Sequence, residues 1–441
     1  MKGMSKFQIV LTAVFGAFIL IGVLLFSFSR GSGSKDLAKA TIWGTMSEVT
    51  FQEFLKESGL SRDKTLQIKY VEKRRDTFNQ DFVEALATGV GPDLFFLPQD
   101  SILKHQDKIF PIPFASYSER TFKETFIEEG ELYLTPSGIL GLPFLVDPMV
   151  MYWNRDMFSS AGLSTPPRYW SDMYDLVSKL SAKDTNLTIS KSALSFGEHS
   201  NVANANELLA LLIIQAGNPI TTRGPAIVGD ESAQKFGTVN NLFSQRFNYS
   251  QAPAVQALGF YTEFSNPAKP FYTWNRSLPS SKDFFLSSDL AMYFGFASEL
   301  SDIRLKNPNL NFAVAQIPQA KDAERVATFG RMVALAIPRN SANVAGAFQV
   351  AVRLTDAASQ TALSKVVNLP PVRRDLLAVR PSEAFMSVFY DGAVQAKAWL
   401  SPEGVVIGPI FREMVESVTG GRANVSQAVY KAAEQLNTAL K

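Results

Sequence analysis

The sequence predicts an α/β protein of more than one domain, preceded by an apolar N-terminal helix. Residues 40–97 contain three strand-like segments separated by two amphipathic helices, with short connections between them. This alternation favours right-handed crossovers and a parallel sheet covered on both faces. A length of 441 residues allows two to three domains, and a hydrophobic content of 46% suits large buried cores.

The N-terminal residues 1–35 are expected to form a signal anchor followed by a short Gly/Ser tether. The segment 9–28 is almost uninterruptedly apolar, and its twenty residues are long enough to span the ~30 Å hydrocarbon core of a bilayer. Lys2 and Lys6 precede it and favour a cytoplasmic N-terminus. Cleavage by signal peptidase is the alternative, because small residues stand at Ser27 and Ser29.

The first part of the folded chain is predicted from periodicity and from helix-stopping glycines. The expected elements are a strand at 40–43, a helix at 46–58, a strand at 66–71, a helix from 78 to Gly89 and a strand at 93–97. Ligands on such sheets sit beyond the carboxyl ends of strands. We therefore expect a site near residues 43–45 and 98–100.

The stretch 138–170 is expected to connect the first part of the chain to the second. Gly141 to Phe144 predicts a short strand that enters a turn at Asp147-Pro148. Met149 to Trp153 is a compact apolar run typical of a buried strand. Arg155 to Gly162 has helical spacing and ends at a glycine.

The rest of the chain continues the alternation of helices and strands. Helices are expected at 171–182, 204–216, 253–264, 342–355, 357–367 and 425–440, and strands at 193–196, 311–316 and 332–337. The helix at 204–216 is apolar on most sides and should be buried. Residues 218–248 are polar with scattered glycines, which indicates an insertion or a hairpin.

Composition excludes several classes of function. The 43 basic and 41 acidic side chains are interspersed, so no nucleic-acid partner is expected. The chain has no cysteine, which excludes disulfides, thiolate metal sites and cysteine nucleophiles. His105 and His199 stand in no metal-binding or triad motif, and no phosphate loop is present. We expect no metal, no cofactor and no enzymatic activity.

Several of these segments resemble one known family. The pattern GLPF…YWNRDMF…AGL…PPRYW at 141–170 is similar to the motif of extracellular solute-binding proteins of sugar ABC transporters, of the maltose-binding-like group. GPDLFFLPQD at 91–100, the AM strand within 284–299 and LPPVR at 369–373 add to this resemblance. It extends from about residue 40 to the C-terminus.

The resemblance implies a two-lobed periplasmic-binding-protein type II fold with three interlobe hinge segments. Lobe 1 would comprise residues 36–151 plus 333–382, and lobe 2 residues 152–332 plus 383–441. The hinges are expected at 149–152, 332–337 and 381–385.

A carbohydrate site needs polar groups for sugar hydroxyls and aromatic rings for the apolar sugar faces. The candidates for the polar contacts are Gln99, Asp100, Asp147, Glu198 and Arg331, and those for stacking are Trp43, Trp274, Phe296 and Phe411. The family motif implies that Asp147 at the lobe crossing is the strongest of them.

Several candidates have a structural alternative. Asp100 is equally suited to cap a following helix, and Glu198 to be an exposed loop carboxylate. Each ring, Trp43 included, is alternatively part of a core. Phe296 matches the position of an aromatic that stacks on the ligand in the family, although a tryptophan is usual slightly further along, and Trp274 is the alternative source of that ring.

The function that the resemblance implies is that of a substrate-binding protein of an ABC importer. The chain would be a monomer held by its N-terminal helix at the outer face of the cell membrane as a single-pass protein. It would capture an oligosaccharide between its lobes and deliver it to the permease subunits. Alternatives are another polar solute such as a glycerol phosphate or a peptide, or a ligand-sensing subunit. A third is a glycan-processing enzyme that uses Asp147 with Glu198.

Overall fold

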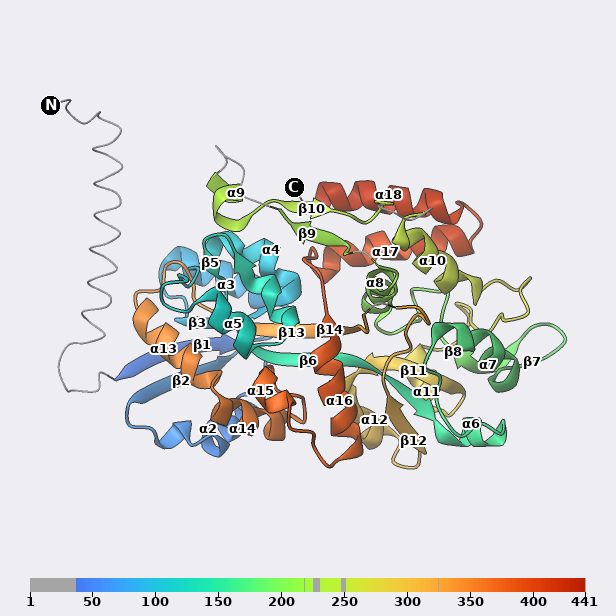
Figure 1. Cartoon of the computed structure of the whole chain (residues 1–441), viewed down its shortest axis with the longest axis horizontal. Helices are drawn as coiled ribbons and strands as arrows, with labels where there is room; N and C mark the ends of the chain where they lie inside the picture. Colours follow the sequence, from blue (N-terminus) through green and yellow to red (C-terminus); the bar gives the residue numbers. More distant parts are fainter. Residues whose placement is uncertain (1–36, 218, 225–230, 247–250, 324, 441) are drawn as a thin grey trace, which may run out of the picture.

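The computed structural model describes residues 37–217, 219–224, 231–246, 251–323 and 325–440 (Figure 1). The expected membrane anchor at 1–35 lies outside these residues. Within the described ranges, no helix is both long and apolar enough to cross a membrane.

The fold is built on one continuous mixed sheet that runs through both halves of the molecule (Figure 1). Its strands follow the order β2-β1-β3-β13-β6-β11-β8-β7, with β12 paired to β6 and β14 to β13. The strands are β1 (Ala38–Gly44), β2 (Leu66–Glu72), β3 (Leu94–Pro98), β6 (Leu142–Asn154), β7 (Ala182–Lys183), β8 (Ile189–Leu194), β11 (Leu290–Phe296), β12 (Phe312–Ala315), β13 (Thr328–Ala336) and β14 (Ala396–Lys397).

Strand β6 crosses from one half of the sheet to the other without interruption. It pairs antiparallel with β13 as far as Pro148, which lies opposite Gly330, and with β11 from Met149, which lies opposite Phe296. The predicted turn at Asp147-Pro148 is therefore wrong. Strand β13 pairs with β6 before this point and β11 pairs with it after this point. Strand β6 therefore has hydrogen-bonded partners along its length and stays extended.

Lobe 1 contains the parallel unit predicted from the sequence. Strand β1 pairs parallel with β2 on one side and with β3 on the other. Figure 1 shows α3 and α4 on one face of this half-sheet and α2 and α14 on the other. The helices and 3₁₀ turns of this region are α2 (Glu48–Glu57), η1 (Leu60–Arg62), α3 (Phe78–Thr88), η2 (Gln99–Ser101), α4 (Ile102–His105), η3 (Gln106–Lys108), α5 (Glu119–Thr125), η4 (Glu128–Tyr133), α13 (Val344–Leu354), α14 (Ala357–Val367) and α15 (Arg374–Leu377), and a small hairpin joins β4 (Leu134–Thr135) to β5 (Gly138–Ile139).

Local sequence explains where the first helix of lobe 1 begins and ends. Ser47 is the N-cap of α2, and its hydroxyl accepts a hydrogen bond from the Thr50 amide at 3.1 Å. Gly59 follows the helix with φ of 76°, a left-handed conformation that glycine adopts without steric cost. The buried face of α2 carries Phe51, Phe54 and Leu55, which join the apolar core of lobe 1.

Lobe 2 surrounds the other half of the sheet. Strand β11 pairs parallel with β8 and antiparallel with β6. The predicted burial of the apolar helix is confirmed, since seven residues of α8 are buried. The helices and 3₁₀ turns here are α6 (Arg155–Ser160), η5 (Trp170–Asp172), α7 (Met173–Leu180), α8 (Ala205–Gln215), α10 (Pro253–Glu263), α11 (Ser281–Leu286), η6 (Ala297–Glu299), α12 (Leu300–Lys306), α17 (Gly404–Thr419) and α18 (Val425–Ala439).

Two further segments lie between or across the lobes. Helix α16 (Ala384–Gln395) stands between the two halves of the molecule in Figure 1 and leads into β14, which pairs parallel with the start of β13. The polar segment 218–248 contains the predicted hairpin, in which β9 (Thr221–Arg223) pairs antiparallel with β10 (Val239–Asn241). The short helix α9 (Glu231–Phe236) lies between these two strands.

Candidate functional site

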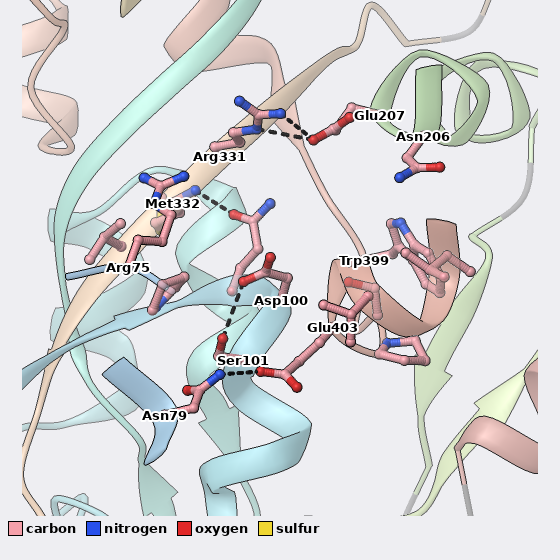
Figure 2. A pocket seen from close by; sticks show the side chains of 18 of the residues that line it. Arg75, Asn79, Asp100, Ser101, Asn206, Glu207, Arg331, Met332, Trp399 and Glu403 are labelled. Atoms are coloured by element: carbon pink, nitrogen blue, oxygen red, sulfur yellow. Dashed lines mark hydrogen bonds and ion pairs between the residues drawn. The ribbon is translucent and has the colours of Figure 1, made fainter. Parts of the chain in front are cut away.

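A cavity of about 520 Å³ lies between the lobes, within the usual size range of small-molecule sites. Thr45 follows β1, Arg75 follows β2, and Pro98 to Ser101 lie at the end of β3. The cavity thus lies at the ends of β1 and β3, where a ligand was expected, and the end of β2 adds to it. Lobe 2 contributes the first turn of α8 and the segment from Trp399 to Phe411 (Figure 2).

The lining combines aromatic rings with polar groups, as recognition of a carbohydrate requires. Trp399 and Phe411 are nearly parallel, with ring centroids 6.4 Å apart and an interplanar angle of 13°. The other aromatic lining residues are Phe78, Phe96 and Phe329. The polar lining residues are Thr45, Arg75, Asn79, Gln99, Asp100, Ser101, His105, Asn206, Glu207, Arg331, Ser401 and Glu403.

Arg331 is held in the cavity wall by contacts to lobe 2. Its Nε donates to Glu207 Oε1 at 3.1 Å, Nη2 makes an ion pair with the same carboxylate, and Nη2 also donates to Asn204 Oδ1 at 3.2 Å. The guanidinium carbon lies 3.7 Å from the ring centroid of Phe296. Arg331 belongs to β13, so this cluster connects β13 to α8.

Gln99 lines the cavity, but both ends of its side-chain amide are hydrogen-bonded to β13. Its Nε2 donates to the Gly330 carbonyl at 2.8 Å, and its Oε1 accepts from the Met332 amide. Both ends of the side chain therefore hold β13 at the point where it enters lobe 1.

Asp100 presents its carboxyl to the cavity. Its only side-chain partner among the described residues is the Ser101 hydroxyl, at 3.3 Å. Although the side chain is exposed to the cavity, the surrounding protein desolvates the carboxyl and raises its pKa, and the nearby Glu403 raises it further. Helix α4 has no side-chain cap hydrogen bond, so the capping alternative for Asp100 finds no support.

Glu403 joins the lobes across the cavity. Its carboxylate accepts from Asn79 Nδ2 at 2.6 Å and from Lys104 Nζ at 2.6 Å, and both donors belong to lobe 1 (Figure 2). Asn79 is oriented by the buried His105, whose Nε2 lies 2.8 Å from Asn79 Oδ1. Burial lowers the pKa of His105 to about 4, so the imidazole is neutral at neutral pH.

Four of the nine predicted site residues line the cavity: Gln99, Asp100, Arg331 and Phe411. The structure does not bring the two other carboxylates there. Asp147 accepts from the Ser298 amide at 3.0 Å and from its hydroxyl at 2.6 Å, so it links β6 to η6. Glu198 is buried and forms an ion pair with Arg276 at 3.1 Å.

Three of the predicted aromatic residues also lie outside the cavity lining. Trp43 lies under Lys73, whose Nζ is 3.9 Å from the ring centroid. Trp274 is fully buried in an apolar cluster of lobe 2, and its Nε1 donates to Asn201 Oδ1. Phe296 is also fully buried, beneath the guanidinium of Arg331. The surroundings of these rings favour the core alternative that the sequence left open.

The sequence did not single out six prominent lining residues: Arg75, Asn79, Asn206, Glu207, Trp399 and Glu403. Arg75 could have been found from its position, because it follows β2 at the sheet edge that was expected to hold the site. Asn79 lies close by in the first turn of α3, but no local pattern marks it as a site residue. The other four lie far along the chain from lobe 1, and no local pattern marks them either. Within the described ranges, no cluster of three or more His, Asp or Glu residues is arranged to hold a metal ion.

Two lobes on a continuous sheet, with a polar and aromatic cavity between them, define a protein that encloses a small solute. The chain belongs to the bacterial extracellular solute-binding protein family, whose profile matches residues 50–387. The suspected family is thereby confirmed.

Solved structures of low sequence identity share the fold. A cyclo/maltodextrin-binding protein in complex with maltotetraose has a TM-score of 0.71 and 16% identity, over 92% of this chain and 98% of that protein. The sugar-binding protein MalE of Xanthomonas citri has a TM-score of 0.70 and 17% identity, over 91% and 97% of the two chains. These likenesses confirm the predicted two-lobed α/β fold.

Similarity to curated relatives covers less of the chain. A binding protein of Brucella abortus is 27% identical over 111 residues, which are 24% of this chain and 26% of that protein. The sn-glycerol-3-phosphate-binding periplasmic protein UgpB of Escherichia coli K12 is 24% identical over 225 residues, 47% of this chain and 45% of UgpB. The matches thus span from about a quarter to under half of these relatives.

Proposed function

We propose that the chain is the extracytoplasmic substrate-binding protein of an ABC importer and binds a carbohydrate, an oligosaccharide, in the interlobe cavity. It acts as a monomer that delivers its solute to the permease subunits, and it has no catalytic role. The observation that carries the proposal is the cavity itself, because each lobe supplies both polar groups and aromatic rings to it. The named ligands of the similar structures, such as maltotetraose, support a carbohydrate.

Closure of the lobes around the solute is expected to be a hinge motion. The segments 149–152, 332–337 and 381–385 are our proposed hinges, since hinges are a few residues that absorb the change in backbone angles. The two packed cores should move as nearly rigid bodies.

A sugar panel tests the function. A bound oligosaccharide should raise the unfolding temperature of the full-length chain and reduce its radius of gyration in X-ray scattering, with unchanged circular dichroism.

Asp100→Asn should lower the affinity for the bound oligosaccharide roughly tenfold to a hundredfold, because it removes a charged acceptor for hydroxyl groups.

Asp147→Asn is the matched control, since it makes the same chemical change outside the cavity lining. The affinity of this variant for the solute should equal that of the wild type.

Two other outcomes would favour the alternative functions. Tight binding of the solute with an unchanged scattering curve would contradict closure of the lobes and favour a ligand-sensing subunit. Product formation from a glycan would favour an enzyme.

We also propose that residues 9–28 are an uncleaved signal anchor. Twenty apolar residues after two lysines support this. The full-length chain should then remain with membranes through high-salt and carbonate washes, whereas a chain shortened to begin near Lys35 should be released. A mature N-terminus near Arg30, found by N-terminal sequencing, would instead establish a cleaved signal peptide.

A second candidate solute is a polar phosphate ester. The similarity to UgpB, named as an sn-glycerol-3-phosphate-binding protein, favours it over a peptide.

A further inference from the structure

Arg75 differs from its neighbour Arg74 in how its charge is used. Arg74 donates to the Asp76 carboxylate from Nε at 3.1 Å and from Nη2 at 2.6 Å. Arg75 lines the cavity and forms no hydrogen bond or ion pair with any residue that the structure describes. Figure 2 shows it on the lobe 1 side, across the cavity from Trp399.

Two of the other charged lining groups, Arg331 and Glu403, already have charged partners. Arg331 is paired with Glu207, and Glu403 is paired with Lys104. The Asp100 carboxyl has a hydrogen bond only with the Ser101 hydroxyl among the described residues, and none with Arg75. The guanidinium of Arg75 therefore lines the cavity without a bonded carboxylate among the described residues, and its donors are available to a solute.

We propose that the solute carries an anionic group, a carboxylate or a phosphate ester, and that Arg75 binds it. The planar guanidinium presents donors in a fork that matches both groups in a bidentate way. This inference rests on the proposed function, because it concerns the solute of the same cavity. It narrows the solute from a neutral carbohydrate to an acidic sugar or a polyol phosphate.

Matched pairs of compounds test the inference on the full-length chain by thermal shift and titration calorimetry. Glucose is compared with glucuronate and with glucose 6-phosphate, and glycerol is compared with sn-glycerol 3-phosphate. Maltose is added as a further neutral compound. The acidic member of at least one pair should bind more tightly than its neutral counterpart. The two acid types distinguish a carboxylate from a phosphate.

Arg75→Gln should weaken binding of the acidic member about tenfold to a hundredfold and leave the neutral member nearly unchanged. The same loss should appear in wild type as salt concentration rises, since the contact is an ion pair. Arg74→Gln is the matched control and should bind as the wild type does. Because Arg75 contacts no other described side chain through a polar bond, Arg75→Gln should unfold at the wild-type temperature without solute.

Two results would overturn the inference. If neutral and acidic members bind equally and Arg75→Gln affects neither, the solute is a neutral carbohydrate and the proposed function still stands. If no compound of either arm stabilises the protein, the inference and the proposed function fail together.

Discussion

Replacing Trp274 with alanine is expected to lower the free energy of unfolding by about 3–5 kcal/mol, the usual cost of truncating a buried tryptophan. The ring is fully buried, lies edge-on to Phe284 with centroids 5.6 Å apart, and donates to Asn201 at 3.1 Å. Chemical denaturation of the wild type and the variant measures the difference. Solute affinity should be unchanged while the protein is folded, because Trp274 does not line the cavity.

Trp274→Phe separates the two parts of this cost. Phenylalanine retains most of the buried ring and loses the hydrogen bond, which leaves Asn201 Oδ1 without its donor. We expect a smaller loss, about 1–3 kcal/mol. The structure would be contradicted if the Trp274→Ala variant had wild-type stability and bound the solute more weakly. Trp274 would then be a ligand contact.

The comparison of Trp274 with Trp399 shows where prediction from sequence stops. Both tryptophans lie outside regular helices and strands, among polar and small residues. Trp274 is enclosed by α11 and the lobe 2 sheet, whereas Trp399 borders the cavity because β14 brings the chain back beside β13. Local sequence carries no information on that return, so the two rings could not be told apart.

Contacts that are local in sequence were predicted more successfully. The parallel unit of β1, β2 and β3 follows from short connections and helical periodicity, and its strand ends placed the cavity correctly. Gln99 and Asp100 were found this way. By contrast, Glu403 acts through Lys104 and Asn79, which are 299 and 324 residues away. Only the folded structure brings these groups together.

The Asp147-Pro148 pair is a similar case. Such a dipeptide favours a turn when it is considered alone. In the structure, β13 and β11 supply ladder partners on either side of it, and Ser298 satisfies the Asp147 carboxylate. Tertiary pairing thus overrides the local preference, and the strand continues through both lobes.

Glu129 lies beside Gly330 of β13 and is expected to make the free energy of unfolding fall as pH rises. Its side chain is only 2% exposed, and neither carboxylate oxygen has a hydrogen-bond partner among the described residues. A Cβ atom at Gly330 would collide with this carboxylate, so the two are in close contact. Burial raises the pKa of Glu129 from 4.5 to about 8, the nearby Lys397 lowers it in part, and Asp147 adds to the increase.

The sign of the pH dependence follows from proton binding. Between pH 4.5 and 8 the folded protein keeps the Glu129 proton, whereas the unfolded chain has lost it. Unfolding therefore releases a proton, and raising the pH favours the unfolded state. Stability from the protonated carboxyl is fully present below pH 4.5 and declines up to about pH 8, by about 5 kcal/mol in all at 1.4 kcal/mol per pKa unit.

Glu129→Gln should remove this decline, because the amide is nearly isosteric and does not ionise. The free energy of unfolding, measured by denaturant titration from pH 5 to 9, should fall less steeply in the variant than in the wild type. The difference between the two proteins should grow by about 4 kcal/mol over this range. His105 titrates in both proteins, so its contribution cancels in the difference.

Glu128→Gln is the matched control on the neighbouring residue. Glu128 forms an ion pair with Lys397, which lowers its pKa, so it is already ionised in both states above about pH 5. Its replacement should cost a modest, nearly constant amount of stability between pH 6 and 9 and leave the wild-type decline in place. Parallel pH curves for wild type and Glu129→Gln would mean that Glu129 is ionised in the folded protein. Its carboxylate would then have to be solvated or paired, contrary to its position against Gly330.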